Sequence, residues 1–358
     1  MSFLKASTYH PPQWASSLQP QPSSRLSLAQ LPTPIHPWNA PGVPEGVELW
    51  VKRDDRTGVA VSGNKIRKLE FLLAEAVQGG YDCVMTCGGI QSNHCRSTAA
   101  AARLLGLDSY LLLRTNEPEA TKELVGNLLV DHMVNATIIP VSYEQYTRRA
   151  TLMQELAQEL QEQGRRPLVI PEGGSNALGT WGYLEAIREL QEQCAEVGWQ
   201  PTDMVFACGS GGTAAGLALG SALAQAPWKV HAINVCDDAA YFHNIANSIF
   251  QDLQAPCTSE EVLSIIDGYK GLGYAKSRPE ELHLLRDVAH TTGIVLDPVY
   301  TGKGFYGLSQ ELQNNSSVFQ GNRILFIHTG GLFGLYDKAS QLLPLLPAQP
   351  LFTWAEGR

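Results

Sequence analysis

Residues 204–216 read MVFACGSGGTAAG, and the change of character within this stretch decides the fold. The apolar run 204–208 is typical of a buried strand, residues 209–213 form a glycine-rich loop, and a helix is expected from Ala214 onward. Successive amides of such a loop and the positive end of the following helix attract an anion. No lysine follows the glycines, which excludes a Walker A loop. The stretch therefore predicts a phosphate site at a strand-to-helix turn.

The same alternation of strand and helix continues on both sides of this stretch. Strands are expected at 47–53, 83–87, 110–113, 137–141, 168–171, 204–208, 230–235 and 323–328, and helices near 65–78, 91–105, 121–133, 144–163, 177–197, 213–225, 238–250, 279–292 and 332–342. Near-continuous apolar strands alternating with helices predict an α/β fold, with open, mostly parallel twisted sheets covered by helices. Residues 1–46, rich in Pro, Ser and Gln, are expected to form an extended arm.

Four glycine-rich loops follow predicted strands, at 86–96, 171–179, 207–216 and 328–334. In parallel sheets, ligands bind beyond the carboxyl ends of the strands. Glycine lets the backbone approach a ligand closely and adopt positive φ. Four such loops at one edge favour a ligand site over ordinary turns.

Three interpretations of the loop at 209–213 remain open at this point. It fits a small phosphate monoester, and it also fits the dinucleotide pattern Gly209-x-Gly211-x-x-Ala214, with the acidic pair Asp237–Asp238 after the next strand. That second interpretation predicts a nicotinamide or flavin oxidoreductase. The third is close strand–helix packing without a ligand.

A second motif, SGNKIRKLE, spans residues 62–70. Ser62 or Asn64 is a candidate N-cap, and Lys65, Arg67 and Lys68 then fall in or near the first turn, where the helix dipole disfavours cations. Solvation, or pairing with the acids at 54, 55 and 70, is one explanation. A functional lysine is the other, because the positive helix end is expected to depress the pKa of Lys65 and so to favour the free amine that a Schiff base requires. Together with a phosphate loop, such a lysine indicates pyridoxal phosphate.

Composition excludes several classes of protein. The 358 residues are 44% hydrophobic and 17% charged, and the formal net charge is −9 without a basic tract, so neither nucleic acid nor a membrane surface is an expected partner. No apolar run of about 18 residues predicts a membrane span. No secretory signal begins the sequence, so the cytoplasm is expected, with an organellar transit peptide as the alternative.

Seven cysteines occur without a CxxC pair, which is typical of small buried hydrophobes in a reducing compartment. Cys83, Cys87, Cys95 and His94 match no common zinc spacing. No metal site is therefore predicted.

The motifs SGNKIRKLE, GGIQSNHCR, GSGGTAAG and DPVYTGKG, in this order, resemble the fold type II pyridoxal-phosphate enzymes. The similarity covers most of the chain, from about residue 31 to 334. It points to the branch that contains D-cysteine desulfhydrase and 1-aminocyclopropane-1-carboxylate (ACC) deaminase. It implies a fold like that of the tryptophan synthase β-subunit, with a small domain (66–178) inserted between the two parts (1–65 and 179–358) of a large cofactor domain. It also implies a homodimer with the active site in the cleft.

The resemblance further implies the roles of individual residues. It assigns cofactor contacts to Lys65, Asn93, Gly209, Ser210, Gly211, Gly212, Thr213, Tyr300 and Thr329, substrate contacts to Ser92, Asn93, His94 and Thr301, and catalytic roles to Lys65, Ser92, Tyr274 and Tyr300. Lys65 would carry the cofactor and move the proton at Cα. Ser92 and the amides of 91–94 would hold the substrate carboxylate, and either tyrosine would polarise or protonate the reacting group.

Two positions favour desulfhydrase over deaminase. ACC deaminases typically have Glu and Leu where this chain has Thr301 and Thr329. A neutral hydroxyl favours an unprotonated pyridine nitrogen and a weaker electron sink, which suffices when thiolate leaves. The resemblance therefore implies β-elimination of D-cysteine to pyruvate, hydrogen sulfide and ammonia. The alternatives are ACC deamination, elimination from another D- or sulfonated amino acid, and a regulatory protein that binds the cofactor without turnover.

Overall fold

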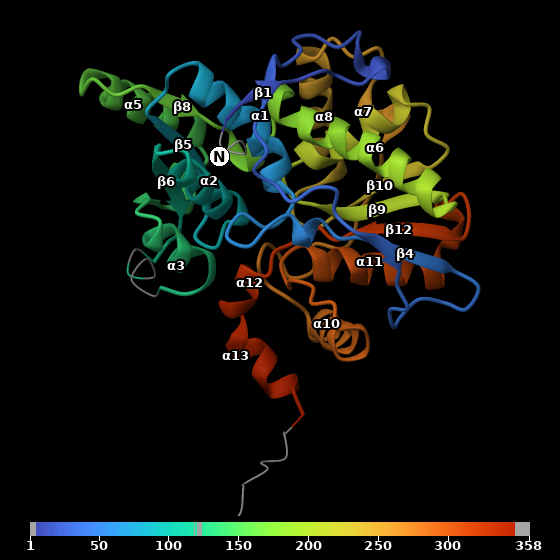
Figure 1. Ribbon diagram of the computed structural model, residues 1–358. Coiled ribbons are helices and arrows are strands. Elements are labelled where there is room, and N and C mark those ends of the chain that lie inside the picture. Colours follow the sequence, from blue (N-terminus) through green and yellow to red (C-terminus); the bar gives the residue numbers. More distant parts are fainter. Residues whose placement is uncertain (1–4, 118, 120–123, 348–358) are drawn as a thin grey trace, which may run out of the picture.

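The computed structural model describes residues 5–117, 119 and 124–347. Most strands fall into two separate sheets (Figure 1). The large sheet runs in the order β11 (Ser264–Ile266), β10 (Lys229–Asn234), β9 (Asp203–Cys208), β12 (Arg323–Ile327), β4 (Glu48–Lys52), β3 (Ile35–Pro37). The small sheet runs β7 (Thr137–Val141), β6 (Asp108–Arg114), β5 (Cys83–Gly89), β8 (Pro167–Val169). Within these two sheets, all pairings are parallel except β3 with β4, which confirms the predicted fold class.

Helices cover both faces of the large sheet (Figure 1). One face packs against α6 (Ala177–Val197) and α7 (Gly212–Leu223), beside which α8 (Ala239–Asp252) and α9 (Ser259–Val262) lie; the other packs against α10 (Pro279–Thr292) and α11 (Thr301–Asn314). The central strand β9 explains the two-sided core, since Met204 and Phe206 enter one cluster and Val205 and Ala207 enter the other. Alternate side chains of a strand point to opposite faces, so both faces of β9 must be apolar.

The small sheet is covered in the same way. Helix α5 (Arg149–Glu162), which follows α4 (Tyr143–Tyr146), packs on one face, and α2 (Asn93–Leu104) and α3 (Gly126–Met133) pack on the other. Helix α1 (Lys65–Gln78) lies between the two halves and contacts both α6 and α2. All four strands of this sheet fall within 66–178, the range expected for an inserted domain.

The N-terminal arm lies against the helices of the core. Its short strands β1 (Ser7–Thr8) and β2 (Ser24–Arg25) pair antiparallel, and Leu18 and Leu26 are buried. The hydroxyl of Tyr9 donates to Glu185 on α6 at 2.5 Å. The arm therefore fastens α1 and α6 from outside.

Several predicted helices differ from the structure. The helix expected at 144–163 is divided into α4 and α5, and the one at 332–342 into α12 (Phe333–Tyr336) and α13 (Ala339–Leu342). The expected helix at 121–133 begins at Gly126, and residues 121–123 lie outside the described part. Helix α11 is missing from the prediction because its glycines lower helix propensity. Gly304 is required there, because a Cβ would lie 2.8 Å from that of Ala207 on β9.

Within the described ranges, none of the helices is both long enough and apolar enough to cross a membrane.

Candidate active site

The carboxyl ends of both sheets open into one cavity of about 770 Å³. Gly89 and Arg114 line it from the small sheet, where they are register partners at the ends of β5 and β6. Cys208 lines it from the end of β9 in the large sheet. The four glycine-rich loops predicted from the sequence all contribute lining residues. They therefore lie together at the carboxyl ends of the strands, as expected.

Lys65 begins α1 and lines this cavity. Burial lowers the pKa of its amine to about 8, against the opposing influence of Cys208 and Glu172. The helix dipole was the expected cause of such a shift, whereas the main cause is desolvation. Asn64 occupies the N-cap position but makes no capping hydrogen bond; its amide instead donates to Thr213 Oγ1 at 3.0 Å. Asn64 thus joins the Lys65 helix to the start of α7.

The loop at 209–213 follows β9 and ends in α7, as predicted. Gly209, Ser210, Gly211 and Thr213 line the cavity. A side chain at Gly209 is excluded, because a Cβ would lie 2.6 Å from the ring of Tyr300. Gly212 is an exception among the predicted residues: it is not among the lining residues of the cavity, and its amide donates to Ser210 O at 3.0 Å.

A buried lysine lies behind this loop. The side-chain nitrogen of Lys68 donates to Gly173 O at 3.1 Å and lies 2.8 Å from the position that a Cβ on Gly212 would take. Burial lowers its pKa. The loops at 171–179 and 209–213 also touch through Ser175 Oγ and Ser210 Oγ, 3.1 Å apart. A phosphate group at the loop would therefore meet backbone amides and hydroxyls, with Lys68 behind the loop.

The predicted SNH motif starts α2. Ser92 is the N-cap, and its hydroxyl accepts from Cys95 N at 3.2 Å. Asn93 lines the cavity with a buried side-chain oxygen that has no hydrogen-bond partner among the described residues. His94 pairs through Nε2 with Thr86 Oγ1 at 2.8 Å, and burial lowers its pKa, so its ring is neutral. The motif thus presents a helix N-terminus and an unpaired amide to the cavity.

Tyr274 and Tyr300 both line the cavity and share a hydrogen bond, with their hydroxyl oxygens 3.0 Å apart. Burial raises the pKa of Tyr274 to about 12 and also raises that of Tyr300. Both phenols are therefore protonated at neutral pH.

Thr301 and Thr329, which were both expected near the cofactor and substrate, lie in different surroundings. Thr329 lines the cavity, but Thr301 does not. Thr301 is fully buried, and its hydroxyl donates to Asp297 Oδ1 at 2.7 Å and accepts from Asp297 N at 2.8 Å. The turn before α11 directs this hydroxyl inward, so the predicted contact of Thr301 with substrate does not agree with this arrangement.

Several residues of the site were not identified as such from the sequence. They are Asn64, Arg114, Tyr143, Tyr146, Arg149, Glu172 and Ser175, which line the cavity, and Lys68 behind it. Glu172 and Ser175 belong to a glycine loop that was predicted, and Arg114 directly follows a predicted strand. The position of Tyr143 and Tyr146 depends on the turn after β7, which periodicity does not describe.

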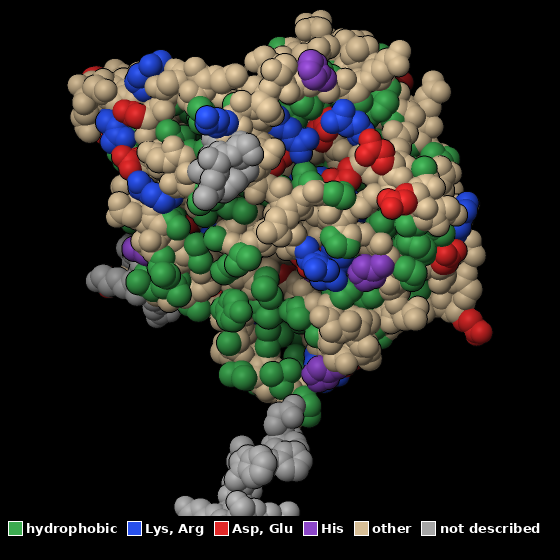
Figure 2. All heavy atoms as spheres, in the orientation of Figure 1, with side chains coloured by type: hydrophobic (Ala, Val, Ile, Leu, Met, Phe, Trp, Pro, Cys, Tyr) green, Lys and Arg blue, Asp and Glu red, His purple; other side chains and the backbone are tan. Residues whose placement is uncertain are grey.

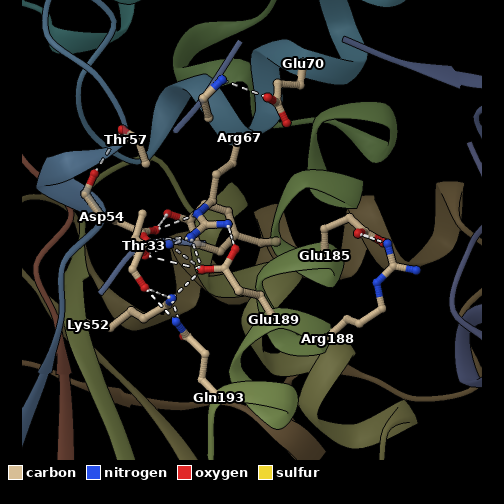
Figure 3. A network of polar contacts seen from close by, with 12 residues as sticks. Thr33, Lys52, Asp54, Thr57, Arg67, Glu70, Glu185, Arg188, Glu189 and Gln193 are labelled. Carbon is tan, nitrogen blue, oxygen red and sulfur yellow. Dashed lines mark hydrogen bonds and ion pairs between the residues drawn. The ribbon is translucent and has the colours of Figure 1, made fainter. Parts of the chain in front are cut away.

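A buried ionic network orients the Lys65 helix (Figure 3). The guanidinium of Arg67 contacts Asp54 at 2.8 Å and Glu189 at 2.9 Å, and Lys52 also pairs with Glu189. Thr33 of the arm joins through its hydroxyl to Asp54 at 2.9 Å. The alternative that these cations serve ion pairs is therefore right for Arg67, whereas Lys65 and Lys68 face the cavity and its loop. The network fixes α1 between β4 and α6.

Residues 26–330 match the family of pyridoxal-phosphate dependent enzymes. Since the match covers most of the chain, the protein belongs to this family and is an enzyme that depends on pyridoxal phosphate. This membership overturns the dinucleotide interpretation of the 209–213 loop. Asp238 of the acidic pair instead caps α8, accepting from Tyr241 N at 2.8 Å.

Several similar proteins are named for D-cysteine desulfhydrase or ACC deaminase activity. A bifunctional D-cysteine desulfhydrase/ACC deaminase, mitochondrial, of Arabidopsis thaliana is 51% identical over 353 residues, covering 96% of this chain and 87% of the relative. A D-cysteine desulfhydrase of Klebsiella pneumoniae is 37% identical, covering 87% and 95%. A crystal structure of an ACC deaminase homologue superposes with a TM-score of 0.81 at 35% identity, covering 94% and 100%.

The residues of the cavity fit pyridoxal phosphate. The side-chain oxygen of Asn93 has no hydrogen-bond partner among the described residues and can accept from a bound group. The loop at Gly209 leaves no room for a side chain. Lys65 is the amine to which the aldehyde would be attached. The 209–213 loop would hold the phosphate.

Proposed function

We propose that this enzyme eliminates sulfide and ammonia from D-cysteine. The overall reaction takes D-cysteine and water to pyruvate, hydrogen sulfide and ammonia. Support comes from the names of two relatives, at 51% and 37% identity. Thr329 lies on the cavity wall at the position where ACC deaminases typically have Leu, and this difference agrees with the choice.

One observation carries the proposal. A lysine with a pKa of about 8 shares a cavity with two protonated tyrosines whose hydroxyls are 3.0 Å apart. β-Elimination needs a base at Cα and an acid at the leaving sulfur. Neutral Lys65 can take the Cα proton, and Tyr274 or Tyr300 can protonate the departing thiolate. Bound pyridoxal phosphate supplies the electron sink for the charge left at Cα.

The carboxylate of the substrate has a separate place. Ser92 and the first amides of α2 present hydrogen-bond donors and the positive end of a helix dipole to the cavity. Binding there would hold the substrate by its carboxylate and leave Cβ free to face the tyrosines. The D configuration rests on the resemblance and on the relatives, because the local geometry is open to either isomer.

The test uses the purified enzyme with D-cysteine, L-cysteine and ACC in separate assays. The proposal expects sulfide and pyruvate in equal amounts from D-cysteine alone, with Lys65→Ala inactive. Release of 2-oxobutanoate from ACC, without sulfide from D-cysteine, would replace it with ACC deaminase, the second activity that the Arabidopsis relative is named for.

We infer a homodimer as the assembly. Apolar side chains gather near the C-terminal helices (Figure 2), where Leu332, Tyr336, Leu343 and Leu346 are 45 to 64% exposed. Large exposed apolar patches mark protein interfaces. Light scattering on the protein eluted from a size-exclusion column should give twice the mass of one chain. The double variant Tyr336→Glu, Leu343→Glu should give the mass of one chain.

We propose the cytoplasm as the compartment, with an organelle matrix as the alternative suggested by the mitochondrial relative. All seven cysteines are unpaired, which suits either reducing environment. Imaging a C-terminal fluorescent fusion distinguishes the two.

A further inference from the structure

One cation of the cavity has no role in the proposed reaction. The charged residues on the cavity wall are Lys65, Arg114, Arg149, Glu172 and Asp237. Arg149 and Glu172 pair with each other at 3.1 Å. Lys65 is the proposed cofactor lysine. Arg114 therefore stands out as a permanent positive charge that the mechanism above does not use.

Arg114 is held by aromatic rings alone. Its guanidinium carbon lies 4.9 Å from the ring centroids of both Tyr143 and Tyr146, and 5.1 Å from that of Tyr274. Its Nε is buried without a hydrogen-bond partner, and no ion pair of Arg114 occurs in the part of the chain that the structure describes. Aromatic faces stabilise the charge but accept none of the guanidinium hydrogen bonds. Because Arg114 lines the cavity, an acceptor on a bound ligand can satisfy the guanidinium.

The position of Arg114 fits the side-chain end of an amino-acid substrate. It is the register partner of Gly89, three residues before the Ser92 N-cap where the substrate carboxylate is proposed to bind. Tyr274 is close to both Arg114 and Gly89: its ring contacts Arg114, and its hydroxyl would be 3.4 Å from a Cβ on Gly89. The proposed acid at the leaving group is therefore also in contact with this cation.

We propose that Arg114 is a specificity-determining residue that binds a negatively charged group on Cβ of the substrate. The class includes thiolate, sulfinate, sulfonate and carboxylate substituents. A planar guanidinium can donate two parallel hydrogen bonds to an oxyanion of this class. The inference rests on the proposed function in one respect, that the ligand is an amino acid bound in this cavity.

The experiment compares two ligands of equal shape and different charge. D-Aspartate and D-asparagine are titrated calorimetrically into the enzyme loaded with pyridoxal phosphate, and their Kd values are compared. The wild type should bind D-aspartate at least tenfold more tightly. Arg114→Gln should weaken D-aspartate by roughly 10- to 100-fold, the range for charge-assisted hydrogen bonds, and leave D-asparagine unchanged.

Controls separate charge recognition from general disturbance. Arg148→Gln removes an exposed arginine that does not line the cavity, and it should keep the wild-type preference. Arg114→Lys keeps the charge without the planar fork and should give an intermediate preference. It also serves if Arg114→Gln does not fold, as judged from circular dichroism and the visible absorption of the cofactor.

Three results would overturn the inference: no binding of either ligand, equal wild-type Kd values, or equal weakening of both ligands by Arg114→Gln. Failure of the proposed function is visible separately. An enzyme that forms no sulfide from D-cysteine but still prefers D-aspartate through Arg114 would refute the desulfhydrase proposal and uphold this one.

Discussion

The hydroxyl oxygens of Tyr274 and Tyr300 lie 3.0 Å apart, and their rings meet edge to face with centroids separated by 6.1 Å. Tyr300 packs on Gly209 beside the phosphate loop, and Tyr274 packs on Gly89 at the end of the small sheet. The pair therefore connects the two edges that form the cavity. Only one hydroxyl can donate in this contact, which leaves the second proton free for substrate.

Removing either hydroxyl should lower kcat without loss of the cofactor. Tyr274→Phe and Tyr300→Phe keep the rings but remove the proposed acid, so kcat should fall by about 100-fold or more. Steady-state assays of pyruvate release measure the change, and the visible spectrum reports bound cofactor. Tyr269→Phe is the control, because its hydroxyl pairs with Glu311 and it is not among the cavity-lining residues. Full activity of both variants would exclude the tyrosines as acids.

The pKa of Lys65 sets how cofactor loading depends on pH. Burial disfavours the ammonium, so at pH 7 about one Lys65 in ten is neutral, against about one in three thousand at the ordinary value. The rate of loading onto apoprotein should rise with pH up to about 8 and level off above it. Stopped-flow absorbance after addition of pyridoxal phosphate measures this. A rate that still rises tenfold per pH unit near pH 10 would contradict the shift.

A methyl group at Gly209 should weaken cofactor binding. The Cβ of Gly209→Ala would lie 2.6 Å from Tyr300 Cε1, so either the ring or the loop must move. We expect the Kd for pyridoxal phosphate to rise at least tenfold, which corresponds to about 1.4 kcal/mol. Gly334→Ala is the matched control, since its Cβ meets nothing closer than 4.0 Å. Fluorescence titration of both apoproteins gives the comparison.

Glu189 should be essential to stability in the ionic network. Burial opposes its ionisation, but Arg67 and Lys52 outweigh burial and lower its pKa to about 2. Glu189→Gln leaves the buried Arg67 undercompensated and should reduce the free energy of unfolding by about 3–5 kcal/mol. Asp108→Asn, at a half-exposed pair with Arg165, should cost about 1 kcal/mol or less. Urea denaturation of the apoproteins measures both.

The same pKa shift fixes a pH dependence. Because the folded-state value of Glu189 lies below its ordinary 4.5, its contribution to stability is complete above pH 4.5 and is lost as pH falls towards 2. The stability difference between wild type and Glu189→Gln should shrink across that window. A difference that stays constant down to pH 3 would assign the effect to packing instead of charge.

Thr301 should act on stability and not on substrate binding. Thr301→Val removes a hydroxyl that makes two hydrogen bonds with Asp297. The free energy of unfolding should therefore fall by about 1–3 kcal/mol, while KM for D-cysteine stays unchanged. Thr291→Val, on the exposed end of α10, is the comparison. A raised KM with unchanged stability would restore the predicted contact between Thr301 and substrate.

The sequence by itself determined the elements of the fold and the location of the site. Apolar strand runs and helical periodicity predicted α1, α6 and α10 with the bounds observed. These signals are local, because each depends on the repeat of a single strand or helix. The glycine loops could be placed at one edge because parallel strands have their carboxyl ends on the same side. Lys65 and the 209–213 loop followed from the same reasoning.

Only the tertiary structure decided how side chains from distant segments meet. The contacts of Arg114 with Tyr146 and Tyr274 bring together β6, α4 and the segment that carries Tyr274. Asn64 donates to Thr213, which is 149 positions away in the sequence. Thr301, which was expected to contact substrate, is not among the cavity-lining residues, and its hydroxyl is bound to Asp297. The pKa of Lys65 depends on how much water its surroundings exclude, which no local spacing records. Local pattern specifies the elements, whereas desolvation and charge pairing arise only when those elements pack together.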